Sequence, residues 1–272
     1  SGENPEEALE SERKSELGDA NAENEAEKIV LSVEDYNVTF DREIMEHVSF
    51  VLHAGDKVAI VGPNGTGKTT LLRDVIKGEN PAIRLGENVK MAYLSQMHGE
   101  VFDEKATVLK NFEDAGFDTD DQVIAYLKTY GFEKELIYSS VCDLSGGEKN
   151  LLQLAKISRT GAGLLLLDEP TSHLDTYSQL ALEQAVEKYN GTVLMVSHDF
   201  YTVANCMDYV LLTEDKGLRK VSMRKFRKMI YADHFDKDYL EYEQKKKELE
   251  NRIAFALQAG KYEDAKKISQ EL

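Results

Sequence analysis

The 272-residue sequence has few cysteines, no tryptophan and no long apolar run. Its two cysteines, Cys142 and Cys206, cannot build a disulfide framework, and no His/Cys cluster has the spacing of zinc ligands. The longest obvious apolar run, 161–167, has seven residues, whereas a membrane-spanning helix needs about 20. The start also lacks a charged-then-apolar signal segment. These absences predict a cytoplasmic protein without a transmembrane segment.

Positive charge is also scarce. The chain has 33 Lys and Arg against 50 Asp and Glu, a net charge of −17, which excludes a generally basic, nucleic-acid-coating surface. Residues 1–28 hold ten acidic and three basic residues and no aromatic, which predicts a disordered acidic leader or the end of a linker. The stretch 216–228 is the exception, with seven basic residues and no acidic one. It is either an RNA-facing patch or a solvated hairpin and helix face.

From residue 29 onward, short apolar runs alternate with helical patterns. Runs bounded by turn or charged residues predict strands at 29–33, 48–52, 58–61, 89–93, 164–167, 192–196 and 209–212. Helical patterns fall at 67–77, 106–112, 121–130, 146–157 and 176–189. This alternation predicts an α/β fold with a largely parallel, buried sheet.

Two further segments have a helical character. Residues 100–140 are polar and show no strand run, so we expect an inserted helical subdomain at about 100–158 of a domain that spans 29–233. In the tail 234–272, Tyr242, Leu249, Ile253 and Leu257 recur at helical steps among many Lys and Glu. Gly260 is a plausible helix stop, so the tail is expected to form a helical hairpin or coiled coil.

A glycine-rich loop follows the predicted strand 58–61 and opens a helix. Its residues match the phosphate-loop pattern G-x-x-x-x-G-K-[ST]: Gly62, Pro63, Asn64, Gly65, Thr66, Gly67, Lys68, Thr69 and Thr70. Glycines let backbone N–H groups turn toward phosphates, and the helix N-terminus adds positive potential. Lys68 would reach the β- and γ-phosphates, and the Thr69 hydroxyl would bind Mg²⁺.

Two carboxylates follow a second buried run, and a second glycine loop opens another helix. The run 164–167 ends in Asp168 and Glu169, which a parallel sheet would present at its ligand edge. Asp168 would hold Mg²⁺, and Glu169 would deprotonate the water that attacks the γ-phosphorus. The second loop is a further anion site of serine hydroxyl and backbone N–H groups, formed by Ser145, Gly146, Gly147 and Glu148.

In this order, the motifs resemble those of ATP-binding cassette (ABC) ATPases, a family of P-loop NTPases. The resemblance implies an ABC-type nucleotide-binding domain with a mixed sheet, and Leu144–Glu148 as its signature motif. It implies catalytic roles for Lys68 and Glu169, a Mg²⁺ contact from Gln96, and a γ-phosphate contact from His198. Asp175 would cross a dimer interface. Phe40 stands where the family stacks an aromatic on adenine, and Tyr36 is the alternative.

The sequence from Asp168 to Asp175 resembles the ABC-F branch, whose members act on ribosomes and carry two cassettes without a membrane domain. Ser172 and Leu151 depart from the branch's usual residues, and neither departure removes a phosphate or Mg²⁺ contact. The family pairs two cassettes head to tail, so Ser145 and Gly147 would serve the nucleotide of a second cassette. The resemblance therefore implies ATP, Mg²⁺, a partner cassette and a ribosome or rRNA. A transporter's ATP-binding subunit and a non-hydrolysing ATP clamp are the alternatives.

Overall fold

A six-stranded sheet forms the centre of the molecule in the computed structural model, which describes residues 28–41, 43–94, 101–172, 174–232 and 237–269. Its strand order is β5-β6-β7-β3-β8-β9, and only β9 runs antiparallel to its neighbour. The strands are β3 (Lys57–Val61), β5 (Met91–Leu94), β6 (Leu164–Asp168), β7 (Thr192–Val196), β8 (Tyr209–Glu214) and β9 (Gly217–Ser222). The predicted α/β class with a mixed, largely parallel sheet is confirmed.

Strand β6 illustrates why these segments form the centre. All four leucines of 164–167 are fully buried. Leu164 and Leu166 belong to one apolar cluster and Leu165 and Leu167 to another, because successive side chains of a strand point to opposite faces. The sheet is thus covered on both faces, as a continuous apolar run requires.

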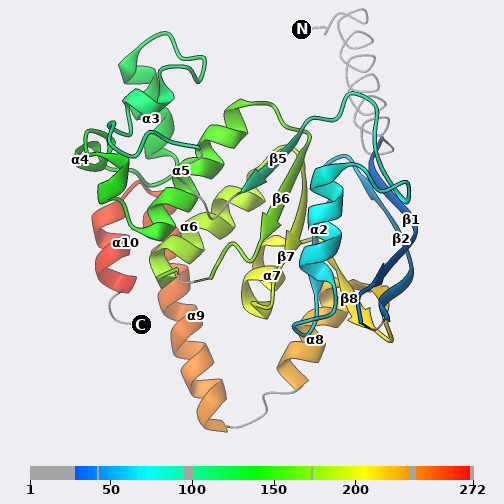
Figure 1. Ribbon diagram of the computed structural model, residues 1–272. Coiled ribbons are helices and arrows are strands. Elements are labelled where there is room, and N and C mark those ends of the chain that lie inside the picture. Colours follow the sequence, from blue (N-terminus) through cyan, green and yellow to red (C-terminus); the bar gives the residue numbers. More distant parts are fainter. Residues whose placement is uncertain (1–27, 42, 95–100, 173, 233–236, 270–272) are drawn as a thin grey trace, which may run out of the picture.

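One face carries helix α2 (Lys68–Lys77) and a smaller antiparallel sheet of order β2-β1-β4. Its strands are β1 (Ile29–Thr39), β2 (Glu43–His53) and β4 (Ile83–Leu85). Leu71 and Val75 of α2 share an apolar cluster with Leu31 of β1 and Leu166 of β6. Helix α2 therefore lies between the two sheets (Figure 1).

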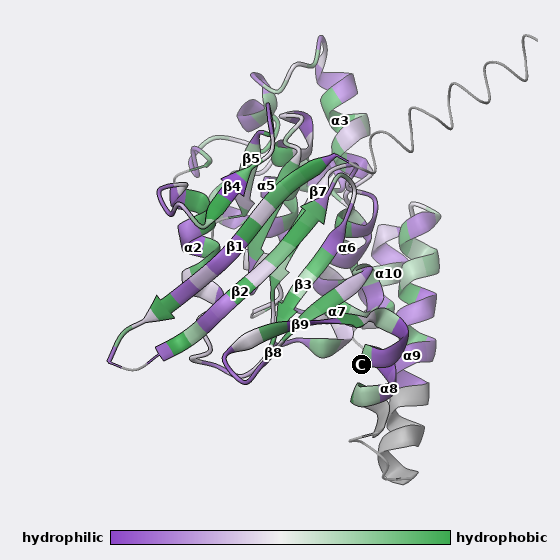
Figure 2. Cartoon of the chain, turned by 90° about the vertical axis from the view of Figure 1, so that its right-hand side faces the viewer, coloured by the Kyte–Doolittle hydropathy of each residue, from purple (hydrophilic) through white to green (hydrophobic). Residues whose placement is uncertain are grey.

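The opposite face carries a layer of helices. The layer is formed by α3 (Asp120–Lys128), α4 (Lys134–Ile137), α5 (Gly146–Arg159), α6 (Thr176–Glu187), α7 (Phe200–Cys206) and α9 (Lys237–Gln258). Helix α8 (Met223–Ala232) follows β9, and α10 (Tyr262–Ser269) follows α9. In Figure 2, β3 of the central sheet is coloured as apolar, and the coloured part of α9 carries both polar and apolar bands. Within the described ranges, no helix is both long and apolar enough to span a membrane.

The prediction of a helix over 106–112 is wrong. The structure has a 3₁₀ turn there, η2 (Lys110–Phe112), preceded by a turn at 108–109 and an isolated bridge between Thr107 and Ser140. Val108 N–H donates to Ser139 O at 3.0 Å, and Val141 N–H donates to Ala106 O at 3.1 Å. These long-range bonds use backbone groups that a helix would need internally.

The predicted helical tail packs closely against the body of the protein. Gly260, with φ of 71°, separates α9 from α10, a left-handed conformation that glycine adopts without strain. Ile253 and Leu257 of α9 and Ala265 of α10 are buried in the same cluster as the inner face of α6. The hairpin thus shares the core of the helical layer. The side chain of Tyr242, and most of the predicted leader, lie outside the described residues.

Candidate functional site

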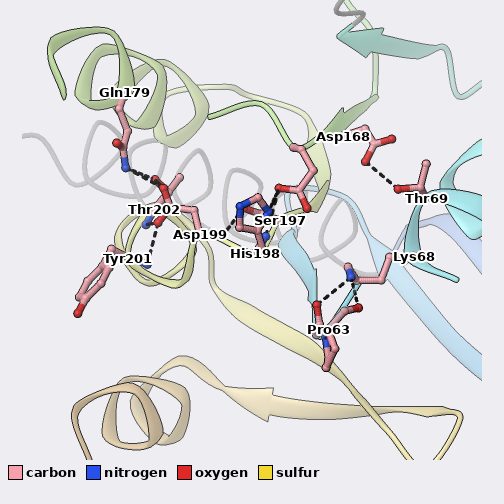
Figure 3. A network of polar contacts seen from close by, with 12 residues as sticks. Pro63, Lys68, Thr69, Asp168, Gln179, Ser197, His198, Asp199, Tyr201 and Thr202 are labelled. Carbon is pink, nitrogen blue, oxygen red and sulfur yellow. Dashed lines mark hydrogen bonds and ion pairs between the residues drawn. The ribbon is translucent and has the colours of Figure 1, made fainter. Parts of the chain in front are cut away.

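Three polar segments meet at one edge of the central sheet. They are residues 62–68 after β3, 168–169 at the end of β6, and 197–199 after β7. The strands β6, β7 and β3 are adjacent and parallel, so their carboxyl ends deliver these side chains to a common edge (Figure 3). The location agrees with the rule that ligands of parallel sheets bind beyond the carboxyl ends of the strands.

The loop between β3 and α2 needs its glycines. Gly65 and Gly67 have φ of 78° and 85°, where a side chain would be strained. Gly62 has no room for a side chain, because a Cβ there would lie 1.7 Å from Thr213 Oγ1 on β8. The backbone can therefore turn tightly into α2, as phosphate cradles require.

Lys68, the first residue of α2, is 6% exposed. Its Nζ donates to Gly62 O at 2.8 Å and to Pro63 O at 2.7 Å. Burial lowers the pKa of Lys68, and the negative charges of Glu169 and Asp168 oppose that shift. Within the described part of the chain, no carboxylate lies within ion-pair distance of this ammonium. A buried cation held by loop carbonyls is suited to an incoming anion.

Thr69 and Asp168 come together across the edge. Thr69 Oγ1 donates to Asp168 Oδ1 at 3.2 Å. Burial raises the pKa of Asp168, the bond from Thr69 lowers it, and Glu169 raises it. A hydroxyl and a carboxylate are oxygen donors of the kind that Mg²⁺ binds together with phosphate oxygens. The pair therefore fits the predicted metal site, and bound Mg²⁺ would relieve the charge that burial disfavours at Asp168.

Glu169 and His198 form the second polar contact of the edge. His198 Nδ1 lies 2.6 Å from Glu169 Oε2, which also accepts the His198 N–H at 3.3 Å. Glu169 has φ of 48°, an uncommon conformation for a residue other than glycine and one that clusters at functional sites. Its N–H is bonded to Val196 O at 2.8 Å. The carboxylate is thus held at the exit of β6, where it can accept a proton.

The second glycine loop lies before α5, in the helical layer. Ser145 Oγ accepts the Glu148 N–H at 3.2 Å, and the Glu148 carboxylate accepts the Ser145 N–H at 2.8 Å, a capping box. Gly146 is exposed, and a Cβ on it would have no atom within 4 Å, whereas a Cβ on Gly147 would lie 2.4 Å from Ser178 Oγ. Gly147 therefore allows α5 and α6 to approach, and Gly146 leaves an open surface at the helix N-terminus.

Comparison with known proteins agrees with this arrangement. A family model described as "ABC transporter" matches residues 45–172. ABC transporter F family member 5 of Arabidopsis thaliana is 38% identical over 192 residues, which are 68% of this chain and 28% of that protein. The energy-dependent translational throttle protein EttA of Escherichia coli is 33% identical over 228 residues, 80% of this chain and 38% of EttA. The chain carries an ABC-F-like ATP-binding cassette.

Solved structures agree on the fold of the cassette. A dimeric ATP-binding cassette in a post-hydrolysis state with ADP and phosphate has a TM-score of 0.57 at 19% identity, and covers 71% of this chain and 99% of that one. The cbiO1 protein of Clostridium perfringens, part of an ABC transporter complex, has a TM-score of 0.59 at 20% identity, covering 76% and 92%. The cassette spans about a third of the length of the curated relatives above.

Asp175, predicted to cross a dimer interface, lies at the start of α6 in the cassette. It caps that helix, accepting the Ser178 N–H at 2.8 Å and the Ser178 hydroxyl at 3.2 Å. The residue is exposed. Its position at a surface helix end is compatible with contact to another molecule. The preceding residues of the motif include His173, which lies outside the described residues.

The structure separates the two candidates for adenine stacking. Tyr36 is fully buried, its hydroxyl donates to Asp74 Oδ2 at 2.8 Å, and it serves the core. Phe40, just past the end of β1, is 66% exposed and free to meet a ligand. Phe40 therefore remains the residue that we predict to stack on adenine. Gln96, the third predicted Mg²⁺ contact, lies outside the described residues.

One cavity adjoins the site, and a larger one lies away from it. One of about 330 Å³ adjoins the phosphate loop and is lined by residues 43–45, 213–217, Pro63, Gly65 and Thr66. Another, of about 600 Å³, lies where α3, α5 and α6 end. Among the residues that the structure describes, none of those predicted for the site lines the larger cavity. The smaller cavity is connected to the phosphate loop.

The basic stretch 216–228 is largely engaged within the cassette. Four of its cations contact acidic, aromatic or backbone groups: Lys216 with Glu43 and Glu46, Arg219 with Glu214, Lys220 over the Tyr209 ring, and Arg227 with Ala204 O. Arg224, Lys225 and Lys228 are exposed on α8. These three residues are the exposed remainder of the stretch, and an RNA contact stays a prediction.

Asp199 and Gln179 are polar residues near the site that sequence reasoning left without a role. Asp199 caps α7 directly after His198, accepting the N–H groups of Tyr201 and Thr202 at 3.1 Å each. Gln179 of α6 donates to Asp199 Oδ2 at 2.9 Å. An aspartate directly before a helix is a common cap, but a contact between residues twenty positions apart produces no periodic pattern in the sequence.

Proposed function

We propose that this cassette hydrolyses ATP with Mg²⁺, in a head-to-tail pair with a second cassette. The observation that carries the proposal is the meeting of Lys68, the Thr69–Asp168 pair and the Glu169–His198 pair at one sheet edge. These are the parts that phosphoryl transfer to water needs: a phosphate cradle, a metal site and a proton acceptor. The chain's ABC-F relatives and the dimeric cassette of the same fold support it.

Each side chain then has a role that its surroundings allow. Lys68, desolvated and bonded to two loop carbonyls, would turn its ammonium to the β- and γ-phosphates. Thr69 and Asp168 would hold Mg²⁺, which neutralises the charge of the phosphate oxygens. Glu169 would accept the proton of the attacking water. His198, bonded to Glu169, would orient that carboxylate and contact the γ-phosphate.

The glycine loop before α5 supports the pairing step. Ser145 and the exposed Gly146 offer hydroxyl and backbone N–H groups at a helix N-terminus, a typical anion site. No hydrogen bond or ion pair in the described part of the chain joins this loop to residues 62–68. The two anion sites would therefore be filled by the ATP of different cassettes, one copy supplying each half.

The role of the pair is proposed to lie in translation, through contact with the ribosome in the cytoplasm. Its support is the translational activity for which one relative, the throttle protein EttA, is named, together with the exposed cations of α8. The proposal of a ribosome contact depends on the resemblance of the chain to the ABC-F branch. Membrane association of the chain instead of ribosome binding would favour the transporter alternative.

The test is the variant Glu169→Gln. We expect ATP turnover to fall at least about hundredfold, because the amide cannot accept the proton, while ATP binding measured by calorimetry is retained. The matched control is Glu187→Gln, a change at an exposed glutamate of α6, with unchanged turnover. Hydrolysis by Glu169→Gln at the unmutated rate would overturn the assignment of the base.

The same variant tests the ribosome proposal. With ATP bound and not cleaved, Glu169→Gln is expected to co-sediment with ribosomes more than the unmutated chain does. Equal sedimentation with and without ATP would contradict the proposal of an ATP-dependent ribosome contact, and would leave the hydrolysis result standing.

A further inference from the structure

A network of polar side chains connects α6 to the segment that carries His198. Gln179 Nε2 donates to Asp199 Oδ2 at 2.9 Å and to Thr202 Oγ1 at 2.7 Å. Thr202 Oγ1 also lies 2.7 Å from Glu183 Oε1 and 3.0 Å from Asp199 Oδ2. Figure 3 shows Gln179 reaching from α6 toward Asp199 and Thr202. Two helices that are separate in sequence are thus joined at the base of the site.

Asp199 is the point where the network meets the backbone of His198. Its Oδ1 accepts the N–H groups of Tyr201 and Thr202, and its own N–H donates to Ser197 Oγ at 3.0 Å. Both carboxylate oxygens have donors, so this side chain is locked in one orientation. The backbone on the carboxyl side of His198 is therefore fixed by contacts that end at Gln179.

His198 itself has little else to hold it. Its side chain is 65% exposed, and its contacts within the described residues are those with Glu169 Oε2, through the ring and the backbone N–H. The position of the imidazole ring is consequently determined by the conformation of the backbone between Ser197 and Asp199. Loss of the contacts that hold the Asp199 side chain would therefore displace the imidazole ring of His198.

We propose that Gln179 is a positioning residue that holds His198 against Glu169 through Asp199. This inference rests on the proposed ATP hydrolysis, and it adds a link to the proposed pairing. Gln179 lies four residues, about one helical turn, after Asp175, the cap of α6. A partner cassette that shifts the start of α6 would shift the donor to Asp199, so that pairing and the placement of His198 are coupled.

The test compares two substitutions of Gln179. Gln179→Leu removes the donor and keeps the size of the side chain, and we expect kcat for ATP to fall about tenfold with KM changed less than twofold. Gln179→Arg restores a long N–H donor to the carboxylate and is expected to recover most of kcat. The matched control is Gln184→Leu on the same helix, with unchanged kcat. Thermal unfolding of each variant verifies that it is folded.

A second measurement does not depend on turnover. The ring resonances of His198, observed by NMR at constant pH, are expected to shift in Gln179→Leu and to return in Gln179→Arg. Thr202→Val, which removes the hydroxyl of the same network at nearly constant volume, should shift them too, and serves if Gln179→Leu does not fold.

Two results would overturn the inference: unchanged His198 resonances in a folded Gln179→Leu, or a loss of kcat that is as large in Gln179→Arg. If the unmutated chain does not hydrolyse ATP at all, the proposed function fails, and the resonances still decide whether Gln179 positions His198.

Discussion

The two glycine loops of this protein look alike in sequence and are built differently. The loop after β3 is connected to the rest of its site: Lys68 bonds two carbonyls, and Thr69 meets Asp168 from another strand. The loop before α5 is bonded mainly within itself, through the exchange between Ser145 and Glu148, and Glu148 also pairs with Lys266 of α10 at 4.0 Å. The first loop contacts other elements of a site, whereas the hydrogen bonds of the second loop are satisfied at the surface without such contacts.

This difference separates what one chain can do alone from what needs a partner. A site whose side chains already contact one another is organised before its ligand arrives, which lowers the cost of binding. A helix N-terminus with a satisfied cap and an exposed glycine offers backbone N–H donors to a ligand but does not enclose it. The first loop should therefore bind ATP in a single chain, and the second should matter only when two cassettes meet.

The largest expected effect comes from Lys68→Ala in the first loop. Loss of the ammonium removes charge-assisted contacts to the phosphates, and ATP affinity measured by calorimetry should fall roughly hundredfold, about 3 kcal/mol. Lys149→Ala, at a lysine of α5 that pairs with Glu104 at 3.2 Å, is the control and should bind ATP normally. Unchanged ATP affinity in Lys68→Ala would contradict the claim that the first loop, unlike the second, binds ATP in a single chain.

A smaller effect, and one confined to the pair, is expected from Gly146→Asp in the second loop. No atom lies within 4 Å of a Cβ at this position, and an acidic residue suits the first turn of a helix, so the chain should fold. The added charge would repel the partner's triphosphate, so turnover should fall about tenfold while single-chain ATP affinity is unchanged. Asn190→Asp, an exposed site at the opposite sheet edge, controls for charge. A parallel loss of affinity would show that both loops act in one chain.

The smallest expected effect concerns Glu183 of α6, the helix that meets Gly147 of the second loop through Ser178 and bonds to Asp199 through Gln179. Burial raises its pKa, against the bonds from Thr202 and Asn205, and the charges of Asp199 and Glu250 raise it further. Because the folded-state pKa is the higher one, the stability that the protonated carboxyl contributes is complete below the ordinary glutamate range and is lost as the pH rises through the folded-state pKa. Glu183→Gln should weaken that loss, gaining about 1 kcal/mol at pH 8 relative to pH 5 in chemical unfolding. An identical pH profile in both proteins would contradict it.

The sequence predicted the parts of the fold that depend on local pattern. Continuous apolar runs such as 164–167 identified the central strands, and the glycine-lysine pattern at 62–69 identified the phosphate loop and the start of α2. Strand β4 has three residues with one buried, and β9 carries Arg219 and Lys220, so neither shows an apolar alternation. Strand β4 pairs with β1, which is distant in sequence, whereas β9 pairs with the preceding β8 across the turn at 215–216, a local pairing that the apolar pattern does not mark.

The same limit explains what was missed at the site. The 106–112 segment has helical periodicity, but its backbone is bonded to residues 137–141, and such contacts override local preference. The choice between Tyr36 and Phe40 as the adenine-stacking residue needed the structure, in which the Tyr36 hydroxyl is bonded to Asp74. Gln179 and Asp199 meet because two helices converge, which no spacing within either one could indicate.

The packing of the α9–α10 hairpin has a mechanical consequence. Ile253 and Leu257 are embedded beside α6, and the Tyr262 hydroxyl is bonded to Lys128 O at the end of α3. A tail anchored in this way transmits force. A force applied to the hairpin would therefore act on α6, which meets Gly147 of the loop before α5 through Ser178 and bonds to Asp199 through Gln179.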